Sequence, residues 1–384
     1  MANNNNKDKC NVPNLRFPEF SGEWEMSSIG EQFELYSGNT PSRMNKNQFD
    51  GSINWITSGE LKEHYISDTK EKISEEAAKN NSLKLLPVGT FVIAIYGLEA
   101  NGVRGTCSIT TRESTISQAC MAFTSKMDIQ NEFLYSWYKK HGNIIGIKYA
   151  QGTKQQNLSY DIIERFNISY PCMEEQKKLI RFISLIDQRI ATQNKIIYKL
   201  KSLIKGIAQH CIKATSGITY VKLGDICQIT TGKLDANAQV DNGIYPFFTC
   251  AEQPFKIDNF AFDTEALLIS GNGANLGYIN YYKGKFNAYQ RTYVLDLFSE
   301  NIQYIKWALK VLLPKRIAIE KSSSNTPYIV LSTLTDLRLP IPNKSNQCHI
   351  AKLMQSLERK LSSQIALNGS YNKLKQYLLR QMFI

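Results

Sequence analysis

The sequence predicts an α+β fold: two duplicated mixed α/β domains joined by two long antiparallel helices that pair like a coiled coil. Three observations carry this prediction. Segments of the first half recur in the second, each half contains short apolar runs separated by glycine turns, and each half ends in a long stretch of helical periodicity. We expect a first domain at 1–173, its helix at 174–214, a second domain at 215–344 and its helix at 345–384.

The composition indicates a globular protein with a polyanionic partner. A chain of 384 residues is long enough for two domains or more, and 42% of its residues are hydrophobic. The net charge of +12 makes nucleic acid the first candidate partner, because binding to phosphates releases condensed counterions. Many soluble proteins are also merely basic, so the charge needs support from the architecture.

Neither a membrane segment nor a secretion signal is expected. No run of about eighteen apolar residues occurs, and the polar start MANNNNKDKC lacks the apolar centre of a signal peptide. The eight cysteines include no CxxC pair, which argues against a zinc cluster or a redox pair. We therefore expect a reduced, cytoplasmic protein that contacts no membrane.

Four segments of the first half recur in the second. The matched pairs are IGEQFELYSGNTP with LGDICQITTGKLD, DGSINWITS with NGIYPFFTC, FVIAIYGLEANGVRGTCSI with LLISGNGANLGYINY, and FNISYPCMEEQKKL with LRLPIPNKSNQCHI. Gly38 and Gly232 are 194 residues apart, but Gly105 and Gly277 are only 172 apart. The first half therefore carries an insertion, within ELKEHYISDTKEKISEEAAKNNSLKLLP (60–87). Two copies of one plan indicate a duplicated module and not a solenoid.

Each domain, called a head below, is expected to mix strands with short helices. Apolar runs rich in β-branched and aromatic residues predict strands at TFVIAIYG, TCSITT, ALLISG, YINYYKG and TYVLDLF. The segments Glu132–His141 and Ile302–Leu312 have helical spacing and predict short helices.

A long helix follows Pro171 and again Pro342. Glu174 and Glu175 open the first, where they suit the positive end of the helix dipole. A helix of about 40 residues with a narrow apolar stripe needs a partner helix, and the returning chain supplies one in the antiparallel direction. Glycine costs about 1 kcal/mol relative to alanine in a helix, so Asn368-Gly369 leaves the continuity of the second helix open.

The alternative is two separate helices, each lying on its own head. If the helices pair, the residues expected to pack between them are Leu179, Ile186, Ile190, Ile197, Leu200, Ile204, Leu353, Leu357, Leu361, Leu374 and Leu378.

The stretch LLISGNGANLGYINYY (267–282) raises the possibility of a cofactor. Its glycines are spaced like those of turns that approach the phosphates of a dinucleotide, or that bind S-adenosylmethionine. A dinucleotide turn must lead into a helix, whereas the residues from Tyr278 onward predict another strand. We therefore interpret it as a repeated structural corner and expect no cofactor on this chain.

Other catalytic signatures are absent or weak. The four histidines form no HExxH or HxxxH pair, and no GxxxxGK[ST] phosphate loop occurs. The tetrapeptide Asn325-Thr326-Pro327-Tyr328 is one residue from the Asn-Pro-Pro-Tyr motif of adenine methyltransferases, but the matching loop QGTKQQNLS of the first half lacks it. We expect no catalytic and no metal-binding residue in this chain.

The loop before each long helix, together with cations on turns, is the candidate DNA-binding site. Glutamine and asparagine pair well with adenine, and lysine or arginine with guanine or phosphate. A solvated surface loop is the alternative for each. The candidates in the first half are Arg43, Lys46, Lys62, Arg104, Gln151, Thr153, Lys154, Gln155, Gln156 and Asn157. Those in the second half are Lys233, Lys283, Lys285, Arg291, Lys321 and Asn325.

Several stretches together resemble the specificity subunit of Type I restriction–modification systems. They are LRFPEFSGEWE, SGNTPS, INWITSGEL, PCMEEQKKLIRFISLIDQRI and LKQYLLRQMF, and the resemblance covers nearly the whole chain. It implies two target-recognition domains separated by two antiparallel helices. The second helix entry, PIPNKSNQCHIAKLM, departs from the pattern because it lacks the glutamates of the first.

The resemblance implies a non-catalytic subunit that binds double-stranded DNA. Each head would read one half of a bipartite target, and the helices would set the spacer and dock modification subunits, two per chain. Those subunits would carry S-adenosylmethionine, and restriction subunits would carry ATP and Mg. The rival functions are a nucleotide- or S-adenosylmethionine-binding transferase and a coiled-coil scaffold for protein partners.

Overall fold

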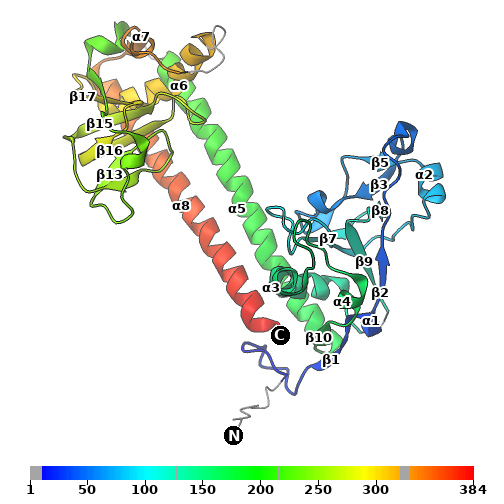
Figure 1. The fold of residues 1–384 in the computed structure, drawn as a ribbon. Coiled ribbons are helices and arrows are strands. Elements are labelled where there is room, and N and C mark those ends of the chain that lie inside the picture. The colour runs from blue at the N-terminus through cyan, green and yellow to red at the C-terminus, as the bar shows by residue number, and fades with distance from the viewer. Residues whose placement is uncertain (1–10, 127, 215–216, 321–327) are drawn as a thin grey trace. The chain divides into compact units, whose positions relative to one another are not determined.

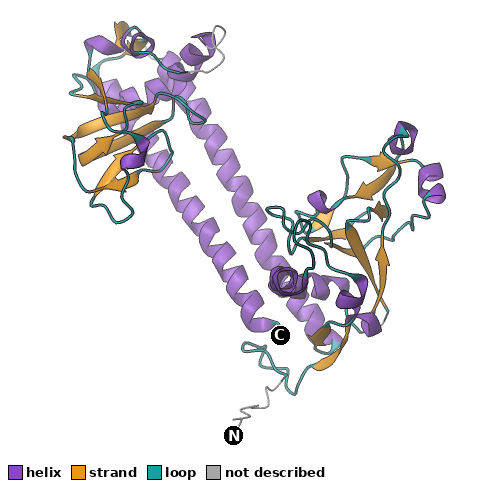
Figure 2. Ribbon diagram, viewed as in Figure 1, coloured by secondary structure: helices purple, strands orange, loops and turns teal. Residues whose placement is uncertain are grey.

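Each half of the chain folds as a mixed α/β head that leads into a long helix, so the predicted architecture is confirmed (Figures 1 and 2). The computed structural model describes residues 11–126, 128–214, 217–320 and 328–384. The chain divides into a first unit, Met1–Thr192 with Asn368–Ile384, and a second unit, Gln193–Leu367. Each unit contains one head and part of both long helices, α5 (Met173–Ala214) and α8 (Lys344–Met382).

The first head is built on three sheets. Its strands are β1 (Glu25–Ser28), β2 (Phe33–Ser37), β3 (Ile53–Ile56), β4 (Tyr65–Ile66), β5 (Lys72–Ile73), β6 (Phe91–Ala94), β7 (Cys107–Thr110), β8 (Ser114–Ile116), β9 (Cys120–Ser125) and β10 (Asn167–Tyr170). The main sheet has the order β2-β9-β6-β7-β4, and β5-β3-β8 and β1-β10 form the others.

The helices of the first head are α1 (Ile29–Gln32), α2 (Glu75–Asn80), α3 (Asn131–Tyr149) and α4 (Tyr160–Glu164), with 3-10 turns at Lys46–Phe49 and Ser58–Glu60. Helix α3 extends beyond the predicted segment and buries Phe133, Leu134 and Tyr138 against the main sheet, where Tyr138 contacts Phe91 edge to face.

The second head repeats this plan with one larger sheet. Its strands are β11 (Thr219–Lys222), β12 (Gln228–Thr231), β13 (Tyr245–Phe248), β14 (Phe255–Ile257), β15 (Phe262–Ser270), β16 (Ile279–Ala288), β17 (Thr292–Asp296) and β18 (Arg338–Ile341). The large sheet has the order β12-β17-β15-β16-β13-β14, and β11 pairs with β18. The helices are α6 (Ile302–Glu320) and α7 (Leu331–Thr335), with 3-10 turns at Leu223–Asp225 and Ala236–Ala238.

Equivalent glycines of the two heads make the same close contact. A β-carbon on Gly38 would lie 1.9 Å from the carbonyl oxygen of Ile116, and one on Gly232 would lie 1.9 Å from that of Ala288. Only glycine lets the two backbones approach so closely. The shared contact confirms the duplication that the sequence indicates.

The glycine-rich turn after β15 is a strand-to-strand corner, as predicted. Strands β15 and β16 pair antiparallel across it, so a strand and not a helix follows the glycines. Gly277, at φ +80°, and its counterpart Gly105, at φ +72°, both have left-handed backbone. A dinucleotide-binding turn requires a helix at this point, so the corner does not support the transferase alternative.

The insertion of the first head supplies β4, β5 and α2. His64, next to β4, anchors it to the rest of the unit. The His64 Nε2 atom lies 2.9 Å from Glu132 Oε2, and the imidazole stacks on Tyr135 with the ring centres 3.8 Å apart. The second head has no comparable segment between the matching glycines, so this anchor belongs to the first head alone.

A buried glutamine fixes the start of each long helix. Gln176 and Gln347, equivalent in the repeat, are 0% and 1% exposed. Each donates from Nε2 to the proline carbonyl five residues earlier, at 3.0 and 2.9 Å. Each also accepts, at 3.0 Å, the backbone amide of the residue just before α3 or α6 begins. One side chain thus ties each long helix to the short helix of its head.

Helices α5 and α8 pack against each other within each unit. In the first unit, Lys375 Nζ of α8 pairs with Asp187 Oδ1 of α5 at 2.5 Å. In the second unit, Gln193 Nε2 donates to Gln364 Oε1 at 2.6 Å, and Met354 joins the core that α5 enters. These contacts exclude the alternative of separate helices, each lying only on its own head.

Helix α8 is continuous through Asn368 and Gly369. The sequence left this point open, and the helix tolerates both residues at a solvent-exposed or half-exposed position. Among the described residues, no helix is both long and apolar enough to cross a lipid bilayer.

Gly369→Ala and Gly206→Ala are each expected to stabilise the protein by up to about 1 kcal/mol, because alanine loses less entropy than glycine on entering a helix. At both positions an added β-carbon would meet no atom within 4 Å. Urea denaturation measures the change in midpoint. Gly38→Ala is the opposite control, since its β-carbon would clash with the Ile116 carbonyl and should lower the midpoint. A fall in midpoint for both helix variants would contradict this prediction.

Candidate nucleic-acid interface

Two loops of the first head, far apart in sequence, form one surface. The loop between β6 and β7 contains Leu98, whose amide donates to Gln156 O at 3.0 Å. The Gln156 amide donates in turn to Glu99 Oε2 at 2.8 Å. Gln151 and Asn157 exchange two backbone hydrogen bonds of 2.9 Å, which close the second loop into a small hairpin. The exposed residues at its tip are Thr153, Lys154 and Gln155.

The same attachment recurs in the second head. The amide of Leu158 donates to Ile95 O at the end of β6, and the amide of Ile329 donates to Gly271 O at the end of β15, both at 2.9 Å. The loop before each long helix is therefore tied to the same strand end in both heads. Lys321 and Asn325, and most of the Asn325–Tyr328 motif, lie outside the described residues.

Arg104 is half-buried and holds the two loops of the first head together. Its Nη2 donates to Gln156 Oε1 at 2.5 Å. Its stem packs on α3 at Gly146, where a β-carbon would lie 2.5 Å from Arg104 Cγ. Its guanidinium therefore helps to position Gln156, and the expected contact of Arg104 with DNA stays a prediction.

Arg43 is exposed, but its charge is paired. Its guanidinium makes two hydrogen bonds to Glu71 and lies over the rings of Phe49 and Trp55, 4.9 and 5.5 Å from their centres. The hydrogen bond to Glu71 raises the pKa of Arg43 above its already high value, and the same bond lowers the pKa of Glu71. A phosphate would have to compete with this carboxylate.

The remaining described cations of the candidate set are exposed. Lys285 Nζ of β16 lies 4.6 Å from the ring centre of Phe260. Lys283 Nζ, two residues earlier, is 3.7 Å from Glu265 Oε2. The candidates that are exposed and form no ion pair within the described parts of the chain are Lys46, Lys62, Lys154, Lys233, Lys285 and Arg291. Their contact with DNA stays a prediction.

The expected packing residues of the long helices differ in burial. Leu179, Leu200, Ile204 and Leu378 are buried, and Ile186, Ile190, Ile197, Leu357 and Leu361 are half-buried. Leu353 and Leu374 are instead each 45% exposed. The residue that follows each of them, Met354 or Lys375, is more buried. Successive residues of an α-helix are about 100° apart around its axis. Leu353 and Leu374 therefore lie on the outer flank of the seam.

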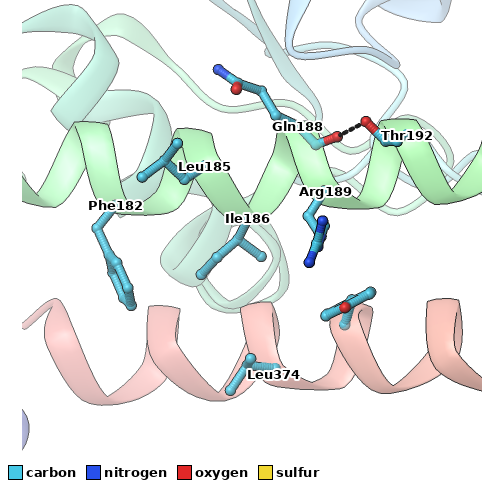
Figure 3. A pocket seen from close by; sticks show the side chains of 8 residues that line it. Phe182, Leu185, Ile186, Gln188, Arg189, Thr192 and Leu374 are labelled. Atoms are coloured by element: carbon cyan, nitrogen blue, oxygen red, sulfur yellow. Dashed lines mark hydrogen bonds between the residues drawn. The ribbon is translucent and has the colours of Figure 1, made fainter.

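In the first unit this flank borders an open groove between α5 and α8, with a volume of about 470 Å³ (Figure 3). Phe182, Ile186 and Arg189 point from α5 toward α8, and Leu374 lies opposite them (Figure 3). Leu185, which also lines the groove, is 54% exposed. Polar side chains, Gln188, Arg189 and Thr192, also line this groove.

The exposed flank has equivalent members in the two helices. The sequence-based assignment expected Leu374 to pack between the helices and did not include its three companions. Ile196 and Leu203 of α5 are 42% and 53% exposed, and Leu367 and Leu374 of α8 are 40% and 45% exposed. Each α8 residue lies 171 positions after its α5 counterpart, the separation of the helix repeat. The sequence does contain a signal for this flank, because each long helix has a second pair of apolar residues spaced seven positions apart. We call these four residues the outer stripe.

The geometry defines a duplicated two-head protein whose helices pair and expose leucine. The sequence profile of the family "Type I restriction modification DNA specificity domain" matches residues 21–202 and 215–368. The chain belongs to this family.

Individual relatives agree with the family assignment. The Type I restriction enzyme EcoDI specificity subunit of Escherichia coli is 42% identical over 143 residues, which cover 37% of this chain but only 32% of the relative. The MjaIX specificity subunit of Methanocaldococcus jannaschii is 24% identical over an alignment covering 88% of each chain. The crystal structure of the M. genitalium Type I S subunit matches with a TM-score of 0.63 at 17% identity, over 97% of this chain and 99% of that one. This last likeness shows a shared fold.

Proposed function

We propose that this chain is the DNA-specificity subunit of a Type I restriction–modification complex, with each head reading one half of a bipartite target. The observation that carries the proposal is the duplicated head. Both copies tie the loop before the long helix to the same strand end, through Leu158 in the first head and Ile329 in the second. A duplicated reader on one chain suits a target made of two separate parts. In this proposal the protein acts in the cytoplasm, on chromosomal and incoming DNA.

The long helices serve two purposes in this proposal. Each is continuous, which supports a fixed spacer between the two half-sites. The outer stripe exposes leucine or isoleucine at positions equivalent in the repeat. Because exposed apolar residues favour burial against a partner, the stripe supports docking of modification subunits, two per chain.

Methylation and cleavage belong to partner subunits in this proposal. Modification subunits would hold S-adenosylmethionine, and restriction subunits would hold ATP and Mg. The glycine corner after β15 supports this division, since it leads into a strand instead of the helix that a dinucleotide turn requires.

Deleting the gene is expected to remove one bipartite adenine-methylation motif from the host genome. Methylome sequencing of strains with and without the gene measures this loss. In a complemented strain, Lys154→Ala combined with Gln155→Ala should relax or change only one half of the motif, because both residues lie on one head and base-edge contacts are worth about 1–3 kcal/mol each.

Lys195→Ala is the control, since Lys195 is exposed on α5 and outside both heads. It should leave the motif intact. If the deletion strain kept every methylation motif, the proposed DNA-specificity function would be contradicted and a protein scaffold would be favoured. Equal damage to both halves by the Lys154 and Gln155 variant would contradict the assignment of one half-site to each head.

A further inference from the structure

The second unit contains a groove whose lining includes no residue of the candidate DNA-binding loops and none of the outer stripe. It lies among α5, α6 and α8 and has a volume of about 550 Å³. Its apolar lining includes Ile204, Ala208, Trp307, Val311 and Leu361. Four lysines also line it, Lys201 and Lys205 from α5 and Lys310 and Lys315 from α6. The groove thus combines an apolar lining with concentrated positive charge.

This groove opens on the opposite side of α5 from the outer stripe. Lys201 and Lys205 lie two residues before and two residues after Leu203. Two residues turn about 200° around an α-helix, so their side chains point about 160° apart. A subunit that covers Leu203 therefore leaves the groove available to another ligand.

Most of the positive charge is not neutralised by any residue that the structure describes. Lys310 pairs with Glu358 at 3.0 Å, and the same carboxylate pairs with Lys306 at 2.7 Å. Lys201, Lys205 and Lys315 are exposed and form no ion pair with any described residue. The groove therefore favours a ligand that carries negative charge.

Trp307 forms part of the apolar lining of the groove. Only 5% of this residue is exposed, yet its indole Nε1 has no hydrogen-bond partner among the described residues. A buried donor without an acceptor costs about 1–3 kcal/mol. The Nε1 atom is enclosed and does not face a ligand, so Trp307 contributes its ring, and Lys310 Nζ lies 4.4 Å from the ring centre.

The first unit has no equivalent groove lining. The repeat places Lys375 where the second unit has Ile204, and Lys140 where it has Val311. Lys375 pairs with Asp187, and Lys140 donates to Phe383 O at 2.6 Å. These two charged residues replace two of the apolar lining positions, so the groove differs between the copies and would take one ligand per chain.

We propose that this groove binds an acidic amphipathic helix of a protein partner. The apolar face of such a helix would cover Ile204, Val311 and Leu361, and its carboxylates would meet the surrounding lysines. A nucleic-acid backbone would satisfy the lysines but leave the apolar lining uncovered, so the combination favours a peptide. The proposal is independent of DNA reading and of docking on the outer stripe.

The test uses the full chain and a synthetic peptide helix of about 18 residues, long enough for five turns. It carries leucines on one face, glutamates elsewhere, no tryptophan, and a fluorescent label for anisotropy. We expect binding in the micromolar range. Lys201→Glu with Lys205→Glu should weaken binding by about tenfold or more.

The matched control is Lys195→Glu with Lys199→Glu, which makes the same charge change on exposed positions of α5 outside the groove. It should change the affinity by less than about twofold. Thermal melts confirm that each variant is folded. The proposal is overturned if the acidic peptide does not bind, if a lysine version binds equally well, or if a DNA duplex displaces the peptide and loses affinity in the same double variant.

Discussion

The affinity of the assembled complex for duplex DNA is expected to fall by about 10³-fold or more when salt rises from 50 to 200 mM. Six candidate cations are exposed and free of ion pairs in the described parts of the chain: Lys46, Lys62, Lys154, Lys233, Lys285 and Arg291. Each neutralised phosphate contributes about −0.9 to the slope of log K against log salt, so six contacts give a slope of about −5. Anisotropy titrations over a salt series measure this slope.

Single-residue variants show which residues contribute to the slope of log K against log salt. Lys154→Ala in the first head and Lys233→Ala in the second should each reduce its magnitude by about 0.9. The double variant Lys222→Ala, Asp336→Ala is the control, because it removes an exposed ion pair outside the candidate set and leaves the net charge unchanged. The variants and the wild type are compared in the same assembled complex, so any phosphate contacts made by partner subunits contribute equally to each slope. A slope near zero, or slopes that neither lysine variant alters, would contradict the phosphate-contact interpretation.

The features that were predictable from the sequence depend on local pattern. Apolar residues recur with the period of a strand in segments such as β15 and with the period of a helix in segments such as α5. These periods can be recognised without knowledge of the fold. The repeat added tertiary information. Gly38 and Gly232 recur because each fits against another strand, and duplication preserved that contact in both copies.

The features that escaped prediction depend on segments far apart in the chain. Arg104 looked like a surface cation, but Gln156, 52 residues later, accepts its hydrogen bond. The lysine-rich groove of the second unit needs Ile204 and Trp307, which are distant in sequence and adjacent only in the fold. The exposure of Leu374 was equally hidden, since a rotation of about 100° separates a seam position from its flank.

Leu203→Asp and Leu374→Asp are each expected to remove one modification subunit from the complex, and the double variant to remove both. The two leucines are 53% and 45% exposed and equivalent in the repeat. Because only about half of each leucine is exposed, burying it stabilises an interface by about 1 kcal/mol, and an aspartate there adds a desolvation cost of several kcal/mol. At about 1.4 kcal/mol per tenfold, docking should weaken by about 100-fold to 1,000-fold. Native mass spectrometry of co-purified complexes counts the subunits.

The neighbouring residues Ser202 and Lys373 supply the control. They are exposed and equivalent in the same repeat, and each lies about 100° around its helix from the adjacent leucine. Ser202→Asp and Lys373→Asp should therefore leave two subunits bound. If one leucine variant removed both subunits, docking would require the two stripe positions together; if neither removed any, the stripe would not be the docking surface. Loss of one subunit per variant requires two separate equivalent surfaces, which a duplicated chain provides and a general coiled-coil scaffold does not predict.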